Sequence, residues 1–465
     1  MNKLLSSVER YTQTAPRQSS KLSLRGISQL VLMLCALIGF AESAWAVPSY
    51  ARQTGYPCTK CHVGGFGPQL TPYGIRFKIN GYTETDHKGF KIPVAAMVMT
   101  GFSHTQTDQA SPPTPHTNVN NNFELDQVSG FLAGRITDDL GVFAQVTYDG
   151  VGKGTAIDNV DMRLAHDFVI ANTDVVLGIS VNNNPGVSDP GNTLPAWYFP
   201  YIGTALVSGT GDFATLLNGG VSTAVAGLSA YAFVNDSIYA EFGTYRALSP
   251  AMQIKFGEGA GNDIGRIDPG SFYWRLNYMQ DMNTQAFSVG LVGLNASIQP
   301  ERIDGGPVNS FRDVGVDASY LYLPSARHNV SAYASYIRED QTRGDLLANG
   351  GADNLNGRLY EFRFNTSYYY DQTYGVTVGR FSTHGTPDAT LYGPSGSPDT
   401  AGTVLQVDWT PWGKEKSWGR PYANARIGLQ YTIYDTFDGA SSNYDGNGRN
   451  ASDNNTLFLF LWMAL

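Results

Sequence analysis

The stretch NARIGLQYTI, residues 424–433, carries apolar and polar side chains at alternating positions. Successive side chains of a β-strand point to opposite faces, so this pattern predicts a strand with one apolar face and one polar, partly charged face. The same alternation recurs in residues 157–168 and 358–370. Charged residues make up only 15% of the chain, and 52 glycines and 27 tyrosines suit turns and aromatic strand faces. The composition therefore favours many short strands over a helical protein, whether soluble or membrane-bound.

The connections between the strands indicate a membrane barrel. From Ile92 to Leu465 the chain reads as about sixteen strands, and the links between them alternate between short and long. Residues 236–237 and 371–373 are examples of short links, and residues 106–121 and 184–226 of long ones. An outer-membrane barrel has this asymmetry, with tight periplasmic turns, long outer loops and both termini in the periplasm. We therefore predict an all-β fold, a transmembrane antiparallel β-barrel over residues 92–465.

The first 46 residues have the features of an export signal. Basic residues precede an apolar run from Leu30 to Phe40, and Ala44-Trp45-Ala46 has the small-x-small form of a cleavage site. The alternative is an uncleaved anchor helix, but the apolar run is too short to span a bilayer. We expect residues 1–46 to be a cleaved signal peptide, which takes Cys35 with it and directs the protein to the outer membrane.

The charge of the chain limits its partners. Its formal net charge is -9, and loss of the signal peptide, which is mainly basic, makes the mature chain more acidic. An acidic exported protein is a poor candidate for binding nucleic acid. The expected contact of the barrel is instead outer-membrane lipid.

After export only Cys58 and Cys61 remain, in the motif Cys58-Thr59-Lys60-Cys61-His62. This C-x-x-C-H form attaches c-type haem: both thiols add to the haem vinyl groups, and the adjacent His supplies the proximal nitrogen to iron. A zinc site would need two more thiolate or imidazole ligands, and the chain has no second cysteine pair. A redox disulfide would be expected within a thioredoxin-like βαβ pattern, which does not follow. The motif predicts one covalently bound haem c.

The haem segment is too short to be a free cytochrome. Residues 47–91 fall below the size at which a chain normally builds its own core. A larger body has to enclose the apolar faces of the haem, and the barrel is the available one. We expect residues 47–91 to be a c-type cytochrome segment that plugs the lumen of the barrel.

The N-terminal part of the chain resembles a known family. Residues 51–62, 68–74 and 77–83 are similar to the start of the monohaem porin-cytochrome fusion family, the outer-membrane cytochromes of iron-oxidising bacteria and their relatives. The similarity extends along the barrel through residues 182–185 and 195–197. The resemblance implies a monohaem cytochrome that plugs a barrel of about sixteen strands. It also implies extracellular Fe(II) as the leading electron donor.

The sixth iron ligand is open among four residues that follow the motif. In the strand from Val94 to Thr105, the parity that places Val94 and Val98 towards lipid places Met97 and Met99 towards the lumen. Met coordination would raise the reduction potential relative to two His ligands. We favour Met97, with Met99 second. His104 has lipid-facing parity, and His87 lies in a polar turn.

Other residues have weaker expected roles around the haem. We expect aromatic side chains of the segment to pack against the porphyrin, namely Tyr56, Phe66, Tyr73, Phe77 and Tyr82. Lumenal arginines such as Arg135, Arg163 and Arg363 can pair with the haem propionates, although most lumenal arginines form the charged ladder of a barrel interior.

Two functions follow from this reading. The first is an electron conduit, a cytochrome that moves electrons between an extracellular donor, with Fe(II) as the leading candidate, and a periplasmic carrier. On that reading the protein acts as an Fe(II) oxidase by electron transfer, without a set of catalytic side chains. The second is a diffusion porin with a haem-bearing plug or sensor segment. Covalent attachment of haem has no purpose in passive diffusion, which favours the conduit.

Overall fold

The structure is a computed structural model that describes residues 49–207, 209–259 and 262–465. The predicted signal peptide, residues 1–46, lies outside the described residues. In the described part of the chain, no helix is long and apolar enough to cross a membrane.

The described chain forms seventeen strands in one sheet. They are β1 (Val94–Thr105), β2 (Asn122–Arg135), β3 (Leu140–Asp149), β4 (Gly154–Ile170), β5 (Thr173–Asn182), β6 (Val225–Val234), β7 (Ile238–Ala247), β8 (Arg266–Ile267), β9 (Phe272–Asp281), β10 (Gln285–Gln299), β11 (Asn309–Tyr322), β12 (His328–Arg343), β13 (Asn356–Tyr370), β14 (Tyr374–Gly385), β15 (Thr400–Trp409), β16 (Asn424–Thr436) and β17 (Thr456–Ala464).

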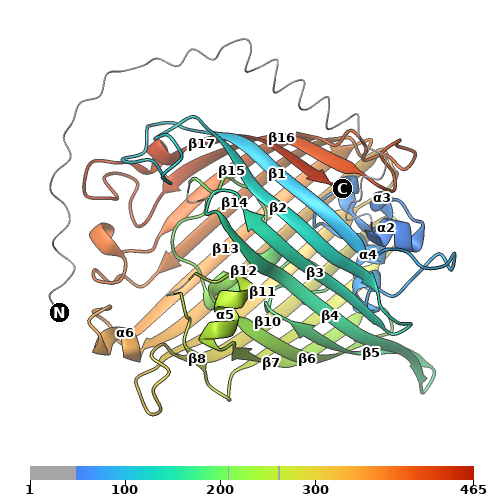
Figure 1. The fold of residues 1–465 in the computed structure, drawn as a ribbon, viewed down its shortest axis with the longest axis horizontal. Helices are drawn as coiled ribbons and strands as arrows, with labels where there is room; N and C mark the ends of the chain where they lie inside the picture. The colour runs from blue at the N-terminus through green and yellow to red at the C-terminus, as the bar shows by residue number, and fades with distance from the viewer. Residues whose placement is uncertain (1–48, 208, 260–261) are drawn as a thin grey trace, which may run out of the picture. The chain divides into compact units, whose positions relative to one another are not determined.

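The sheet closes on itself. β1 pairs with β2 through Met97 and Ser129 and with the last strand, β17, through Met97 and Ala464, and both pairings are antiparallel. β7 pairs directly with β9, and the two-residue β8 pairs with the end of β10 beside the ring. The described strands therefore form a closed antiparallel barrel of sixteen strands, with β8 as an addition (Figure 1). This confirms the predicted fold class.

The two faces of the wall differ in polarity. On β4, Asp161 and Arg163 point inward and have no exposed surface, whereas Met162 and Leu164 point outward and are 37% and 50% exposed. A soluble barrel would bury the apolar side chains and expose the charged ones. Apolar side chains outside and charged side chains inside are the arrangement of a barrel in lipid, so the fold is a porin-like transmembrane β-barrel.

The connections separate the barrel into two ends. Tight turns such as 171–172, 235–237 and 371–373 lie at the short-turn end, and segments such as 106–121 and 437–455 lie at the long-loop end. Exposed aromatic side chains gather near the short turns, as expected of an interfacial girdle: Tyr320, Tyr322, Tyr368, Tyr370, Tyr374 and Trp409. The predicted alternation of connection lengths is present, except that residues 410–423 are a longer connection at the short-turn end and residues 150–153 a short one at the opposite end.

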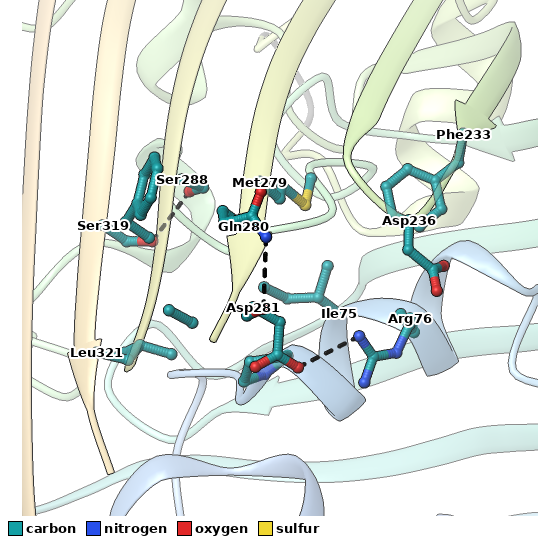
Figure 2. Close-up of a pocket in the computed structure, with 13 residues that line it drawn as sticks. Ile75, Arg76, Phe233, Asp236, Met279, Gln280, Asp281, Ser288, Ser319 and Leu321 are labelled. Atoms are coloured by element: carbon teal, nitrogen blue, oxygen red, sulfur yellow. Dashed lines mark hydrogen bonds and ion pairs between the residues drawn. The ribbon is translucent and has the colours of Figure 1, made fainter. Parts of the chain in front are cut away.

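The N-terminal segment, residues 49–93, lies at the short-turn end with the C-terminus (Figure 1). It contains α2 (Ser49–Thr54), α3 (Cys58–Cys61), the 3-10 turn η1 (Val63–Gly65) and α4 (Pro72–Ile79). Arg76 of α4 reaches Asp281 at the end of β9 at 3.4 Å (Figure 2). The Arg426 side chain of β16 donates to the backbone carbonyl of Phe66 at 2.6 Å. The segment thus packs against the inner wall of the barrel.

The connection between β5 and β6, residues 183–224, folds into the lumen, and we call it the inner loop. It contains the short helices η2 (Pro195–Trp197) and η3 (Leu216–Gly220). Leu194 and Leu217 of this loop are buried in one cluster with Tyr273 and Val292 of the barrel wall. The remaining short helices are α5 (Pro250–Phe256), α6 (Gly344–Ala348), η4 (Gly393–Ser395) and η5 (Ala451–Asn454).

Candidate functional site

The Cys58–His62 turn is built by local interactions. Cys58 to Cys61 form one helical turn, in which residues three apart lie on the same side, and the His62 N–H donates to the Cys58 carbonyl at 2.8 Å. Helix α4 begins beside it, because the Thr71 hydroxyl caps the N–H of Gly74. A side chain at Gly74 would bring a Cβ to 2.4 Å from the Cys61 carbonyl oxygen, so only glycine allows this approach.

The two cysteines are free thiols that line the same cavity. Burial raises the pKa of Cys58, and burial together with the nearby Cys58 and Glu84 raises the pKa of Cys61 to about 12. Both thiols are therefore protonated at neutral pH in this state of the chain.

His62 also lines this cavity. Its Nδ1 atom is buried and has no hydrogen-bond partner among the described residues. Burial is the main cause that lowers the pKa of His62 to about 4, and the charge of Arg426 acts in the same direction. The imidazole is consequently neutral, which is the form that binds metals.

The cavity between the N-terminal segment and the barrel wall has a volume of about 740 Å³. This value lies within the range of about 300–1,000 Å³ that is common for small-molecule and cofactor sites. Of the aromatic residues expected around a porphyrin, Tyr56, Phe66, Phe77 and Tyr82 line it. Tyr73 instead packs edge-on against Tyr56, at 5.5 Å between ring centroids.

Met97 and Met99 point into the lumen, as strand parity predicted. They are 6% and 7% exposed, and both line the cavity that Cys58, Cys61 and His62 line. Met99 is paired with Trp462, whose ring packs on Phe66 at 4.8 Å. Met97 is paired with the small residues Ser129 and Ala464. Whether either sulfur binds iron stays a prediction.

The two histidines among the candidate sixth ligands lie outside the cavity. His87 is in an exposed turn with a φ of 55°, and its backbone N–H donates to the Thr85 hydroxyl. The ring of His104 is hydrogen-bonded to Asn121 at 2.9 Å near the long-loop end. Neither is among the described residues that line the cavity.

Of the three arginines predicted to pair with the haem propionates, only one lies beside the cavity. Arg135 pairs with Asp138 at the short-turn end. Arg163 is fully buried and pairs with Asp161 at 2.8 Å. Arg363 alone among these three lines the cavity.

Lys78 is a site residue that the sequence analysis missed. Its amine is buried, donates to the Val187 carbonyl at 2.7 Å and to Asn192 Oδ1 at 2.9 Å, and lies 4.9 Å from the Trp197 ring centroid. Burial is the main cause that lowers the pKa of Lys78 to about 7. A lysine between Phe77 and Ile79 in an apolar helix is the only local signal of such burial. Lys78 joins α4 of the N-terminal segment to the inner loop.

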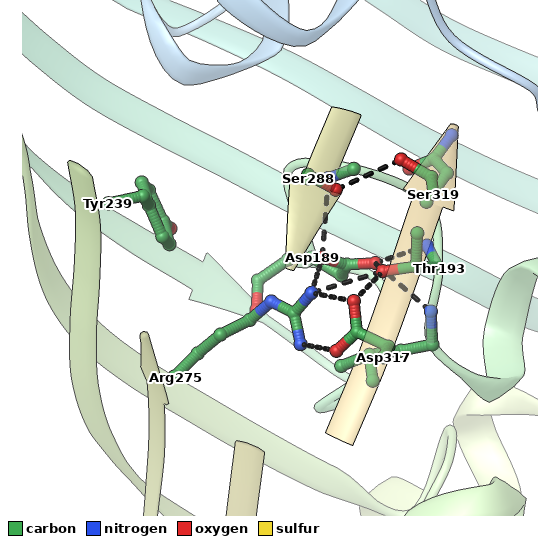
Figure 3. A network of polar contacts seen from close by, with 12 residues as sticks. Asp189, Thr193, Tyr239, Arg275, Ser288, Asp317 and Ser319 are labelled. Atoms are coloured by element: carbon green, nitrogen blue, oxygen red, sulfur yellow. Dashed lines mark hydrogen bonds and ion pairs between the residues drawn. The ribbon is translucent and has the colours of Figure 1, made fainter. Parts of the chain in front are cut away.

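A buried ionic network fixes the inner loop to strands β9 and β11 of the barrel wall. Arg275 of β9 pairs with Asp317 of β11 and with Asp189 of the loop, each at 2.9 Å (Figure 3). The Thr193 hydroxyl donates to Asp317 at 2.6 Å. Further along the loop, the backbone N–H of Leu217 donates to Asp313 at 2.6 Å.

The other cavity and the other polar side chains provide weaker candidate sites. A cavity of about 30 Å³ between α4 and the wall, lined by Ile75, Arg76, Met279 and Asp281, contains none of the candidate haem ligands (Figure 2). Within residues 49–207, 209–259 and 262–465, no group of three or more His, Cys, Asp or Glu side chains is placed to hold a metal ion. The cavity beside Cys58 is therefore the main candidate site.

The comparisons with known proteins concern the barrel. No family model and no curated protein matches the chain. OmpT, an outer-membrane protein of Vibrio cholerae, is 10% identical, with a TM-score of 0.40 over 80% of this chain and 96% of that chain. The anion-selective porin from Comamonas acidovorans is 12% identical, with a TM-score of 0.40 over 80% and 98%. The outer membrane channel DcaP of Acinetobacter baumannii is 10% identical, with a TM-score of 0.42 over 82% and 99%. The strand pairing of the chain itself, rather than these likenesses, establishes the barrel.

Proposed function

We propose that the protein is an outer-membrane electron conduit that binds one c-type haem through Cys58 and Cys61, with His62 as proximal ligand. The observation that carries this proposal is the presence of both free thiols, a neutral imidazole and two lumenal thioethers around one cavity. The residues fit the group, because they supply two attachment points, axial ligands of the right chemistry and aromatic walls.

Met97 is the sixth ligand in this proposal. It lies nearer than Met99 to the short-turn end, where the Cys58–His62 turn is placed. The residues paired with it, Ser129 and Ala464, are small, whereas Met99 is paired with Trp462. When bound, the haem supplies a one-electron centre whose iron alternates between the ferric and ferrous states.

The chain itself forms the walls of the cavity that would hold the haem. The N-terminal segment occupies the short-turn end, and the inner loop fills much of the lumen through contacts such as Arg275–Asp189. The segment and the inner loop take up lumenal space that a bulky solute would need, whereas an electron needs only closely spaced contacts. This supports transfer of electrons rather than of metabolites.

A series of aromatic rings extends from the cavity towards the long-loop end. Phe199, which lines the cavity, packs in one cluster with Phe381, Tyr434 and Phe437. Ring centroids are 5.9 Å apart for Phe381–Tyr434, 5.2 Å for Tyr434–Phe437 and 4.9 Å for Phe437–Tyr444. Because electron tunnelling weakens steeply with distance, this packing supports electron entry from the loop side.

The expected partners are an extracellular donor and a periplasmic electron carrier. Fe(II) is the leading donor, because ferric products precipitate near neutral pH and a cell gains by oxidising Fe(II) outside and importing only the electron. Each Fe(II) gives one electron and leaves as Fe(III). A haem held by Cys58, Cys61 and His62 would supply the one-electron centre between this donor and the carrier.

A second candidate is a diffusion porin whose N-terminal segment is a haem-bearing plug or sensor. The porin-like barrel with a loop folded into its lumen favours this candidate. It predicts that small solutes cross the protein while the haem takes no part in transport.

One experiment separates the two. The purified protein is inserted into sealed vesicles, Fe(II) is added outside, and haem reduction is followed by its absorption, with solute efflux measured in parallel. The conduit predicts rapid reduction without efflux. Reduction by other impermeant donors but not by Fe(II) would keep the conduit and change the donor. Free passage of small sugars or ions without reduction by any impermeant donor would establish the porin.

A further inference from the structure

We infer that Arg363 is the residue that binds the propionate carboxylates of the haem, an inference that rests on the proposed function. Arg363 projects from the middle of β13 into the lumen and is 7% exposed. Its Nε and Nη1 atoms are buried without a hydrogen-bond partner among the described residues. A buried guanidinium with free donors is costly unless an anion completes its contacts.

The four fully buried arginines of the lumen already have such an anion. Their nearest carboxylates are Asp161 for Arg163 at 2.8 Å, Asp317 for Arg275 at 2.9 Å, Asp388 for Arg343 at 3.0 Å and Asp408 for Arg426 at 3.3 Å. Among the described residues, the one carboxylate paired with Arg363 is Glu361, at 3.5 Å from Nη2. Glu361 is itself engaged by the Thr215 hydroxyl and the Asn218 amide, each at 2.7 Å. Arg363 is therefore left with donors for a further carboxylate.

The side chain of Arg363 is held in place for such a role. Its guanidinium carbon lies 5.7 Å from the Tyr198 ring centroid and 5.6 Å from that of Phe381. Cation–π contacts of this kind fix the position of the cation without using its N–H donors. The donors remain available to a planar carboxylate, which a guanidinium binds with two parallel hydrogen bonds.

The direction of the haem fits this position. Its vinyl groups and its propionates lie at different edges of the ring, so a haem attached to Cys58 and Cys61 would need its propionate partner elsewhere along the same cavity. On β13, Tyr369 packs at the level of the N-terminal segment, where its hydroxyl donates to Gln69 at 2.9 Å. Arg363 lies further along the same strand towards the long-loop end and lines the same cavity.

A carboxylate in this place has two sources, the haem propionates or a small free carboxylate that enters the lumen. We commit to the propionates, because Arg363 shares its cavity with both attachment cysteines. A positive charge beside the haem stabilises the reduced state, which carries one more electron. Arg363 is thus a positioning residue that also raises the reduction potential.

The test compares Arg363→Gln and Arg363→Lys with Arg358→Gln in the full-length, haem-loaded protein. Arg358 is the matched control, because it lies on the same strand, is exposed and pairs with Asp340 at 2.9 Å. Arg363→Gln should lower the reduction potential and shift the propionate bending band in the resonance Raman spectrum. Arg363→Lys, which keeps the charge but not the paired donors, should restore much of the potential but not the band. Arg358→Gln should change neither.

The outcomes separate this inference from the function on which it rests. Attached haem with an unchanged band and potential in Arg363→Gln would overturn the inference and leave the conduit intact. Absence of covalent haem from the wild type would overturn the proposed function itself. A titration of a Cys58→Ser/Cys61→Ser protein with acetate provides the other arm. If acetate binding requires Arg363 but the reduction potential of the haem-loaded protein does not depend on Arg363, the site belongs to a free carboxylate. That result would also overturn the inference.

Discussion

At the scale of single residues, Cys58 and Cys61 have a role that can be tested directly. A thioether bond survives denaturation, whereas a haem held only by an axial ligand does not. The wild type should therefore retain haem staining after acid-denaturing electrophoresis. Cys58→Ser or Cys61→Ser should weaken the staining, because one of two covalent bonds is lost, and the double variant should abolish it.

The sulfur of Met97 is expected to tune the iron. Replacement by Ala should remove the sulfur-to-iron absorption band and lower the reduction potential, because Met ligation raises the potential. Val98→Ala is the control, since the neighbouring side chain has the opposite parity in β1. Equal spectra of wild type and Met97→Ala would transfer the role to Met99, which lines the same cavity.

The positions of some of these residues could be predicted from the sequence, and those of others could not. The C-x-x-C-H spacing and the parity of β1 are local properties, so the motif and the lumenal side of Met97 and Met99 could be read directly. The difference between Arg163 and Arg363 could not, because both alternate with apolar neighbours in the same way. What separates them is how closely each is paired: Asp161 lies 2.8 Å from Arg163, whereas Glu361 lies 3.5 Å from Arg363 and also accepts hydrogen bonds from the inner loop. Such contacts depend on the folded lumen.

At the scale of elements, the strands were predictable and the inner loop was not. Period-two alternation marks each strand of the ring, because one face meets lipid and the other meets a polar lumen. The anchoring of residues 183–224 depends on contacts with distant strands, such as Thr193 with Asp317. Glycine, proline and asparagine in that stretch indicate a loop but not where it folds.

Lys78 links two elements and gives the docking of the N-terminal segment a pH dependence. Burial lowers its pKa to about 7, from 10.5 in the undocked segment. Below pH 7, Lys78 is protonated in both the docked and the undocked segment. The positive charge that docking would bury then opposes docking. As pH rises above 7, the docked state loses the proton while the undocked state keeps it, so docking is stabilised, by about 2 kcal/mol between pH 7 and 9.

Hydrogen exchange of residues 49–93 in haem-free Cys58→Ser/Cys61→Ser protein measures this dependence. Protection should increase with pH in that background, and Lys78→Met should remove the increase. Arg76→Gln is the matched control on the same helix. Arg76 forms a half-exposed pair with Asp281, so its loss should cost less than about 1 kcal/mol and leave the pH slope unchanged. An equal slope with and without Lys78 would show that another group titrates.

At the scale of the whole molecule, the strand pairing of the barrel does not depend on the N-terminal segment. The ring closes through β1 and β17, and no pairing of the barrel strands involves residues 49–91. The exposed outer face that faces lipid is likewise independent of this segment. The barrel should therefore fold without the segment, whereas the segment is too short to fold without the barrel.

Removal of residues 49–91 tests what the segment does to the lumen. In the full-length protein the segment and the inner loop together occupy the lumen, so conductance in a planar bilayer should be low. Deletion should increase the conductance several-fold, because the volume of the segment joins the cavity of about 740 Å³ as water-filled lumen. The charged inner wall, including Arg426, would then be solvated rather than paired with the backbone of Phe66. Heat-modifiable migration in electrophoresis would verify that the deleted protein is still a barrel. An equally low conductance after deletion would show that the inner loop alone seals the lumen, whereas a high conductance before deletion would favour the diffusion porin over the conduit.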